Sequence, residues 1–192
     1  MMKPIIYFLS VLFTGSLYGQ QANEQITVVD LKNSSMVIKG KSNVNSFSCH
    51  FNTDYLKEYQ RISHQKNNDL IHFKKAVLVL NAQGFDCGSR GINRDFQELL
   101  NIDEYPDITL ELKNAKTDKK KVSATIVIGI AGKQHEYKVA VTPSRGTQSH
   151  FKGSLHLKLS DYELSQPKKL FGLIQVKDEI EIDFDIATIN VF

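Results

Sequence analysis

The chain has 192 residues, of which 24 are Lys or Arg and 21 are Asp or Glu, giving a formal net charge of +3. This length suits a single domain with a substantial core. The lack of a basic face or an RNA-binding motif argues against nucleic acid as a partner. The sequence contains no HExxH, CxxC or close histidine pair that would indicate a metal site. It also contains no Gly-x-Ser-x-Gly elbow that would indicate a catalytic nucleophile. We therefore predict no catalytic residue, no metal and no cofactor.

The first nineteen residues have the character of a secretory signal peptide. Lys3 supplies a positive charge, residues 4–13 form an apolar run too short to anchor the chain in a bilayer, and residues 14–19 are smaller and more polar. We predict cleavage near Gly19. Residues 20–192 would then form one domain, located in the periplasm or outside the cell.

From residue 25 onward, apolar and polar residues alternate as in β-strands with one dry face. Within the run 44–51, three side chains share one face: Phe47, Cys49 and Phe51. Residues 53–68 are weakly patterned and predict a long connection or an irregular strand. Within the run 69–81, the candidates for one side are Ile71, Phe73, Val77 and Val79. A bulge near Lys74 and Lys75 is an alternative to this uninterrupted alternation.

A short helix is predicted after Cys87. Gly88 and Gly91 open a turn, and the polar run 89–95 offers capping side chains. Three apolar side chains then recur at helical spacing: Phe96, Leu99 and Leu100. Pro106 ends the segment, because a proline disfavours helical geometry in the residue before it. Asp95 is interpreted as a cap in the first helical turn, with a contact to a ligand headgroup as the alternative.

The second half of the chain contains the most regular strands, in the runs 107–112, 122–130, 136–141, 151–159 and 179–186. Such alternation indicates an antiparallel sheet with one buried face. Among all-β folds, an eight-stranded barrel is favoured over a sandwich because closure removes exposed strand edges. The acidic residues between Glu179 and Asp185 are interpreted as a solvated outer face, balanced by a lysine such as Lys152 or Lys158.

The interior of such a barrel would be lined by aliphatic side chains. Eight strands enclose a space that either fills with side chains or holds one small ligand. With no tryptophan in the chain, a dry tube suited to an elongated apolar ligand is one interpretation. A fully packed core would show the same pattern, so the pattern alone leaves both open.

The chain contains two cysteines, Cys49 and Cys87. An even number in an exported protein favours a disulfide, whose loop would contribute about 4 kcal/mol by chain-entropy reasoning. Two buried free thiols are the alternative.

Five segments resemble the YceI-like family of exported lipid-binding proteins: SSMVIKGKSNVNSFSCHF, GSRGINRDFQELLNIDEYPDITLEL, SATIVIGIAGKQHEYKVAV, FKGSLHLKLSDYEL and VKDEIEIDFDI. The resemblance covers nearly all of the chain after residue 19. It implies an elongated, lipocalin-like, eight-stranded antiparallel barrel with one short helix near one end. It also implies a long polyisoprenoid, such as a prenyl quinone tail, held in a tunnel. The cysteine pair resembles a sub-branch of the family.

We therefore predict an exported binding protein that stores or transports a long apolar lipid and is not an enzyme. The residues predicted to line its tunnel are Phe47, Phe51, Val79, Phe96, Leu99, Leu100, Ile108, Leu110, Ile126, Ile128, Val139, Leu155, Leu157, Ile182 and Phe184. The alternatives are a structural or stress-related barrel with a filled core and, ranked below it, a lipid-modifying enzyme. A lysine cluster at Lys116 and residues 119–121 is interpreted as a solvated hairpin tip, with transient membrane contact as the alternative. The sequence leaves open whether the protein forms a homodimer.

Overall fold

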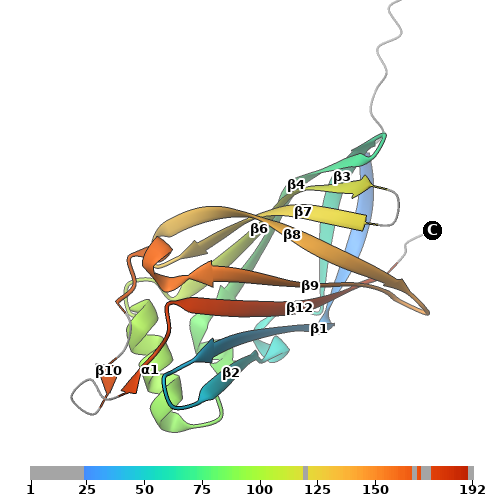
Figure 1. Ribbon diagram of the computed structural model, residues 1–192. Coiled ribbons are helices and arrows are strands. Elements are labelled where there is room, and N and C mark those ends of the chain that lie inside the picture. The colour runs from blue at the N-terminus through green and yellow to red at the C-terminus, as the bar shows by residue number, and fades with distance from the viewer. Residues whose placement is uncertain (1–23, 119–120, 166–167, 170–173, 190–192) are drawn as a thin grey trace, which may run out of the picture.

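Antiparallel strands pair around a closed ring, as the alternation of the sequence predicts (Figure 1). The computed structural model describes residues 24–118, 121–165, 168–169 and 174–189. Eight strands form the barrel, in the ring order β1 (Glu24–Lys41), β3 (Tyr59–Asn67), β4 (Leu70–Asn81), β6 (Asp107–Asp118), β7 (Lys121–Ile130), β8 (Lys133–Arg145), β9 (Ser149–Lys158) and β12 (Glu179–Ile189). The pairing of β12 with β1 closes the ring. The predicted eight-stranded antiparallel barrel is confirmed.

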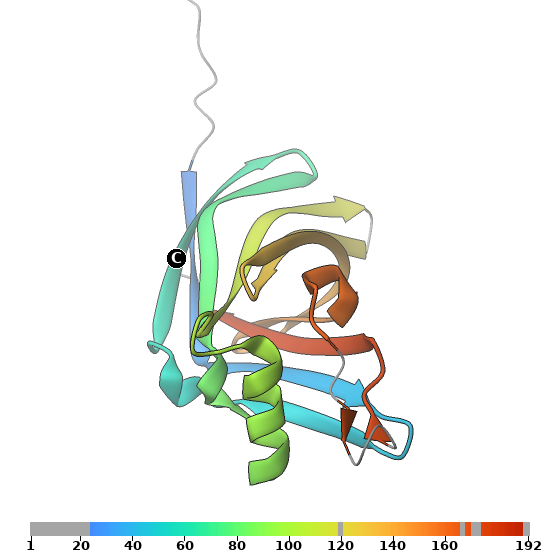
Figure 2. The same cartoon turned by 90° about the vertical axis from the view of Figure 1, so that its left-hand side faces the viewer.

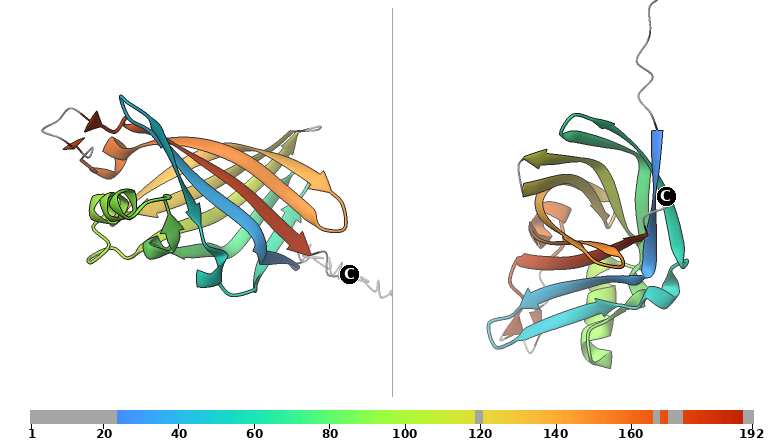
Figure 3. Two further views of the ribbon diagram at one scale, coloured as in Figure 1. Left: turned by 90° about the horizontal axis from the view of Figure 1, so that it is seen from below. Right: turned by 90° about the vertical axis from the view of Figure 1, so that its right-hand side faces the viewer.

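Strand β1 is long enough to take part in three pairings. Its first half pairs with β3 and its second half with β2 (Ser46–Phe51), while β12 pairs along its other edge. The two-residue strand β5 (Phe85–Asp86) extends the sheet beyond β2. Viewed from below, β1, β12 and β9 run side by side along the barrel with helix α1 (Arg90–Leu100) at one end (Figure 3).

A polar cluster holds β1 where it changes partner. The register with β12 shifts between Asp30 and Ser35. The Asp30 carboxylate, 2% exposed, accepts hydrogen bonds from Asn33 and from Gln148 Nε2 at 2.9 Å. Burial by itself raises the pKa of Asp30, but the hydrogen bonds from Asn33 and Gln148 hold it below its ordinary value. The buried carboxylate therefore links the β1 bulge to the β8–β9 turn.

Helix α1 begins and ends with identifiable caps. The Ser89 side chain accepts a hydrogen bond from the Ile92 amide at 3.3 Å, and Asn101 takes a left-handed conformation after the last turn, with φ 51°. Asp95 is the sixth helical residue, so its predicted role as a cap in the first turn is wrong. The first turn contains no acidic residue, and Ser89 caps the helix instead.

The two ends of the barrel differ in what surrounds them. The helix end carries α1, the β7–β8 turn and two 3₁₀ turns, η2 (Ala82–Gly84) and η3 (Leu159–Tyr162). A third 3₁₀ turn, η1 (Thr53–Tyr55), lies beside the middle of β1, where Lys32 contacts Thr53 and Asp54. The short hairpin of β10 (Lys168–Lys169) and β11 (Ile174–Gln175) also lies there. Figure 2 views this end, with α1 and η3 in front of the ring. The far end is formed by the β3–β4 and β8–β9 turns and the last residues of β12.

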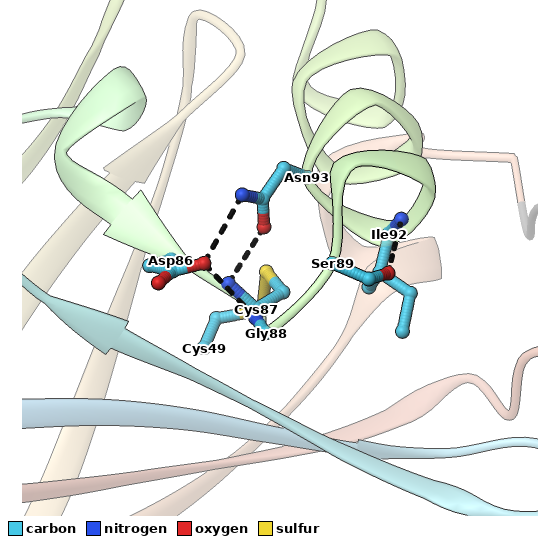
Figure 4. Close-up of a disulfide and its surroundings, with 7 residues drawn as sticks. All are labelled: Cys49, Asp86, Cys87, Gly88, Ser89, Ile92 and Asn93. Atoms are coloured by element: carbon cyan, nitrogen blue, oxygen red, sulfur yellow. Dashed lines mark hydrogen bonds between the residues drawn. A yellow bond between two sulfur atoms is a disulfide. The ribbon is translucent and has the colours of Figure 1, made fainter.

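The predicted disulfide is confirmed. Cys49 of β2 and Cys87, just before α1, are bonded with an S–S distance of 1.99 Å, and both side chains are buried (Figure 4). Around them, Asn93 Oδ1 accepts a hydrogen bond from the Cys87 amide at 2.7 Å, and Asn93 Nδ2 donates to Asp86 Oδ1 at 3.1 Å. The first turn of α1 is thereby attached to β5 and, through the disulfide, to β2.

The interior at the helix end is a packed core. The Phe96 ring lies 5.4 Å from that of Phe85, and Phe85 lies 4.9 Å from Phe51. The Tyr162 hydroxyl donates to the Ile128 carbonyl at 3.3 Å. Other side chains buried in the same cluster are Leu80, Leu100, Ile108, Ile130, Val139, Leu157 and Ile180. The helix therefore closes one end of the barrel with side chains behind it.

The described residues contain no helix with enough length and apolar character to cross a membrane. The predicted signal peptide, residues 1–19, lies outside the described residues.

Candidate functional site

The interior toward the far end is hollow. A cavity of about 330 Å³ lies between the strands there, in contact with residues from all eight barrel strands. Thr117 near the end of β6 is exposed and also lines the cavity, so the cavity reaches the surface at the far end. The barrel thus has a packed half beneath α1 and a hollow half that opens away from it.

The cavity wall consists of inward-facing members of cross-strand pairs. Leu112 of β6 lies between Ala76 of β4 and Ile126 of β7, and all three line the cavity. Across the barrel, the Phe184 ring of β12 lies over Gly153 of β9, where a Cβ atom would overlap it. An aromatic ring covering a glycine on the neighbouring strand is a known way to fill such a position.

The structure divides the predicted tunnel residues into two groups. Five contact the cavity: Leu110, Ile126, Leu155, Ile182 and Phe184. Nine pack into the core at the helix end: Phe47, Phe51, Phe96, Leu99, Leu100, Ile108, Ile128, Val139 and Leu157. The face of α1 is therefore part of the packed core and does not border the cavity.

The prediction that Val79 lines the tunnel is wrong, because its side chain is 47% exposed and does not border the cavity. Lys75 has a left-handed backbone, with φ 51°, in a bulge between His72 and Ala76. Since strand side chains alternate, the extra residues move the inward positions to Ala76, Leu78 and Leu80. The bulge considered near Lys74 and Lys75 is present, and it moves Val79 to the outer face.

Sequence reasoning missed the contribution of β3. Gln60, Ile62 and His64 of this strand line the cavity. Only one of the three is aliphatic, so the inward face does not stand out as an apolar alternation. The position of this segment between two strongly patterned runs could have indicated a strand, because the barrel needs a strand between those two runs.

The cavity is mostly apolar, and the polar side chains of its described lining are one amide, three threonine hydroxyls and one imidazole. Among the described residues that line it, none is Asp, Glu, Lys or Arg. Gln60 Nε2 donates to the Val77 carbonyl at 2.8 Å. His64 Nε2 lies 3.1 Å from Gln25 Oε1, and the His64 ring lies 5.7 Å from that of Phe73. Such a space can hold an apolar chain and would strongly disfavour a buried ion.

The acidic side chains of β12 and their basic partners lie on the outer face of the barrel. Lys152 Nζ and His150 Nδ1 contact the Asp185 carboxylate at 2.9 and 2.8 Å. Partial burial raises the pKa of Asp185, but the hydrogen bonds from Lys152 and His150 hold it below its ordinary value. Lys39 pairs with Asp183. The interpretation of the acidic run as a solvated face balanced by Lys152 is confirmed. In the described part of the chain, no group of three or more His, Cys, Asp or Glu is placed to hold a metal.

An antiparallel barrel with one packed end and an apolar cavity at the other belongs to the lipocalin-like class of β-barrels. Within that class, the chain belongs to the YceI-like family, because residues 22–188 match the YceI-like domain. The resemblance found in the sequence is confirmed.

Solved structures share this fold at low sequence identity. Burkholderia cenocepacia BcnA superposes with a TM-score of 0.58 at 21% identity, over 83% of this chain and 98% of that one. A polyisoprenoid binding domain from Saccharophagus degradans, implicated in plant cell wall breakdown, gives 0.56 at 13% identity, over 85% and 97%. Campylobacter jejuni YceI gives 0.50 at 14% identity, over the whole of both chains. Comparison with curated proteins gave no match.

Proposed function

We propose that this protein binds a long apolar lipid of the polyisoprenoid or prenyl quinone type in the hollow half of its barrel, for storage or transport. The observation that carries the proposal is the cavity of about 330 Å³ with its mostly apolar wall. Membership of the YceI-like family supports it, as does the likeness to the Saccharophagus degradans domain, described as polyisoprenoid-binding.

The energetics of burial favour a hydrocarbon chain in this space. Each CH₂ group removed from water contributes about 0.8 kcal/mol, so useful affinity needs few polar contacts. Pockets for small ligands span roughly 300–1,000 Å³, and this cavity lies near the lower limit. A long prenyl chain would therefore leave part of its length outside the far end or displace side chains from the packed half.

The proposal assigns different roles to the two groups of predicted tunnel residues. Leu110, Ile126, Leu155, Ile182 and Phe184 would contact the lipid, since they border the cavity. The core around Phe96 and Leu100 would form the floor on which the chain ends. No chemical step on the lipid is proposed, because the described part of the cavity wall contains no Asp, Glu, Lys or Arg.

We also propose that the protein acts outside the cytoplasm, in the periplasm or after secretion. The Cys49–Cys87 disulfide supports this location, because such bonds persist mainly in oxidising compartments. Taking up or delivering a prenyl lipid there would require a transient contact with a membrane.

The test is gentle purification of the full chain followed by organic extraction and mass spectrometry, and then uptake of a prenyl quinone by the delipidated protein. Recovery of a prenyl lipid, or saturable uptake of the quinone, is expected. A folded protein that releases no lipid and takes up no quinone would overturn the proposal in favour of a ligand-free structural barrel. Chemical turnover of the captured lipid would instead indicate an enzyme.

A matched pair of variants tests whether the lipid binds in the cavity. Ala124 is buried and lines the cavity, whereas Ala140 on the neighbouring strand is exposed and does not. Ala124→Phe is expected to reduce quinone uptake by filling the space, and Ala140→Phe is expected to leave it unchanged. Equal uptake by both folded variants would place the lipid elsewhere.

A further inference from the structure

The wall of the hollow half contains a gap in the strand ladder between β3 and β4. The two strands pair from Ser63 with Lys74 to Asn67 with Leu70, next to their hairpin. Beyond that point β3 continues along β1, while β4 passes through the Lys75 bulge and continues along β6. Among the described residues, no register pair joins residues 59–62 to residues 76–80. Figure 2 shows the two strands leaving their hairpin together and then separating.

The cavity reaches this gap. Val77 pairs with Glu111, on the face opposite to the inward pair of Leu78 with Leu110. Val77 nevertheless lines the cavity, so the space extends to the strand itself at this point. Strand edges that lack a partner keep backbone N–H and C=O groups available for hydrogen bonding. The gap is thus a polar recess in an otherwise apolar wall.

Gln60 lies in this recess and bridges it. Its side chain is partly buried, lines the cavity, and donates from Nε2 to the Val77 carbonyl at 2.8 Å. This bond takes the place of a missing ladder bond and fixes the orientation of the amide. The other polar atom of the amide, Oε1, is an acceptor that the bond to Val77 does not use.

We propose that this gap is the subsite for an uncharged hydrogen-bonding group of the bound lipid, such as a hydroxyl or an amide N–H, with Gln60 Oε1 accepting its hydrogen bond. The inference rests on the proposed lipid binding and adds to it the chemistry of the polar group. An ionised carboxylate or phosphate does not suit the subsite, because the described residues of the cavity wall include no lysine or arginine to pair with it.

The preference for a donor group has a definite size. A typical intramolecular hydrogen bond contributes a net ~0.5–1.5 kcal/mol, which corresponds to a factor of about 2–10 in affinity. A prenyl alcohol should therefore bind several-fold more tightly than the corresponding hydrocarbon. Its methyl ether, which has lost the donor, should bind like the hydrocarbon.

The experiment measures displacement of N-phenyl-1-naphthylamine from the delipidated full chain by farnesol, farnesyl methyl ether and farnesene. The wild-type protein is expected to prefer farnesol by about 2–10-fold. Gln60→Leu, which keeps the size of the side chain, is expected to remove this preference while retaining binding of farnesene. Gln65→Leu is the matched control, because Gln65 lies on the same strand outside the cavity lining, and it should keep the preference.

Each outcome separates the two proposals. Binding of all three compounds with equal affinity by the wild-type protein would overturn the subsite and leave lipid binding intact, whether or not Gln60→Leu folds. A preference for farnesol that survives in folded Gln60→Leu would also overturn the role of Gln60. Failure of the fluorophore and of every prenyl compound to bind would overturn the proposed function itself.

Discussion

Leu155 and Leu157 offer a direct measure of the division between the hollow and packed halves. Both lie on β9, face inward and are buried to the same degree, with exposed fractions of 5% and 4%. Both belong to the buried core cluster, but only Leu155 also borders the cavity. Changing each to alanine removes the same groups from two different surroundings.

The expected destabilisation differs because only one change creates a new void. Three carbon groups at about 0.8 kcal/mol each account for roughly 2.4 kcal/mol of lost transfer free energy in both variants. In the packed half, Leu157→Ala adds a cavity contribution of about 24 cal/mol per Å³, which brings the cost to about 4 kcal/mol. Leu155→Ala enlarges a space that is already hollow, so its cost should stay near 2 kcal/mol.

The measurement is urea unfolding of the wild type and both variants, with free energies compared at equal m-values. A difference of at least about 1 kcal/mol, with Leu157→Ala the less stable, is expected. Equal costs, or a larger cost for Leu155→Ala, would refute the division of the barrel interior. Fluorophore binding supplies a second readout, because Leu155→Ala should alter it and Leu157→Ala should not.

Three further predictions concern other parts of the barrel. Replacing Cys49 and Cys87 together by serine should lower the free energy of unfolding by about 4 kcal/mol, since the bond spans 38 residues. Unfolding of the wild-type protein, measured with and without a reductant, checks this value. Asp30→Asn should cost about 2 kcal/mol at neutral pH. The depressed pKa of Asp30 stabilises the fold above pH 3.8 and stops doing so as pH falls below it, so the difference in Tm should shrink in acid; a constant difference would contradict this. Gly153→Val should push Phe184 into the cavity and reduce prenyl quinone uptake, and unchanged uptake would count against it.

Most strands of the second half were predictable because they alternate without interruption, whereas β6 has a register shift after Leu112. In β12, for example, Ile180 and Ile182 face the interior and Glu181 faces outward. A regular period of two fixes which face is dry, and closure then follows from the need to cover that face and both edges. The pairing of the two cysteines followed from their even number, since two cysteines allow a single bond.

The position of the cavity was not predictable from the same pattern. Leu155 and Leu157 look alike in the sequence, and only the placement of α1 and the aromatic residues behind it determines which one meets packed neighbours. The Lys75 bulge inverts the faces of β4 after it. The sequence indicated a bulge there only as an alternative, because Phe73, Val77 and Val79 also fit an uninterrupted alternation. Gln60 and His64 are polar residue types, so β3 did not stand out in the sequence as a wall of the cavity.

The closing seam between β1 and β12 has a consequence for how the protein folds. Val28 pairs with Ile189 across almost the whole chain, so the ring cannot close until the final strand is present. Contacts of such long sequence separation slow folding because the intervening chain must be ordered first. One edge of β1 therefore has no partner until β12 is present. A chain that lacks β12 would form an open sheet that is prone to aggregation rather than a smaller barrel.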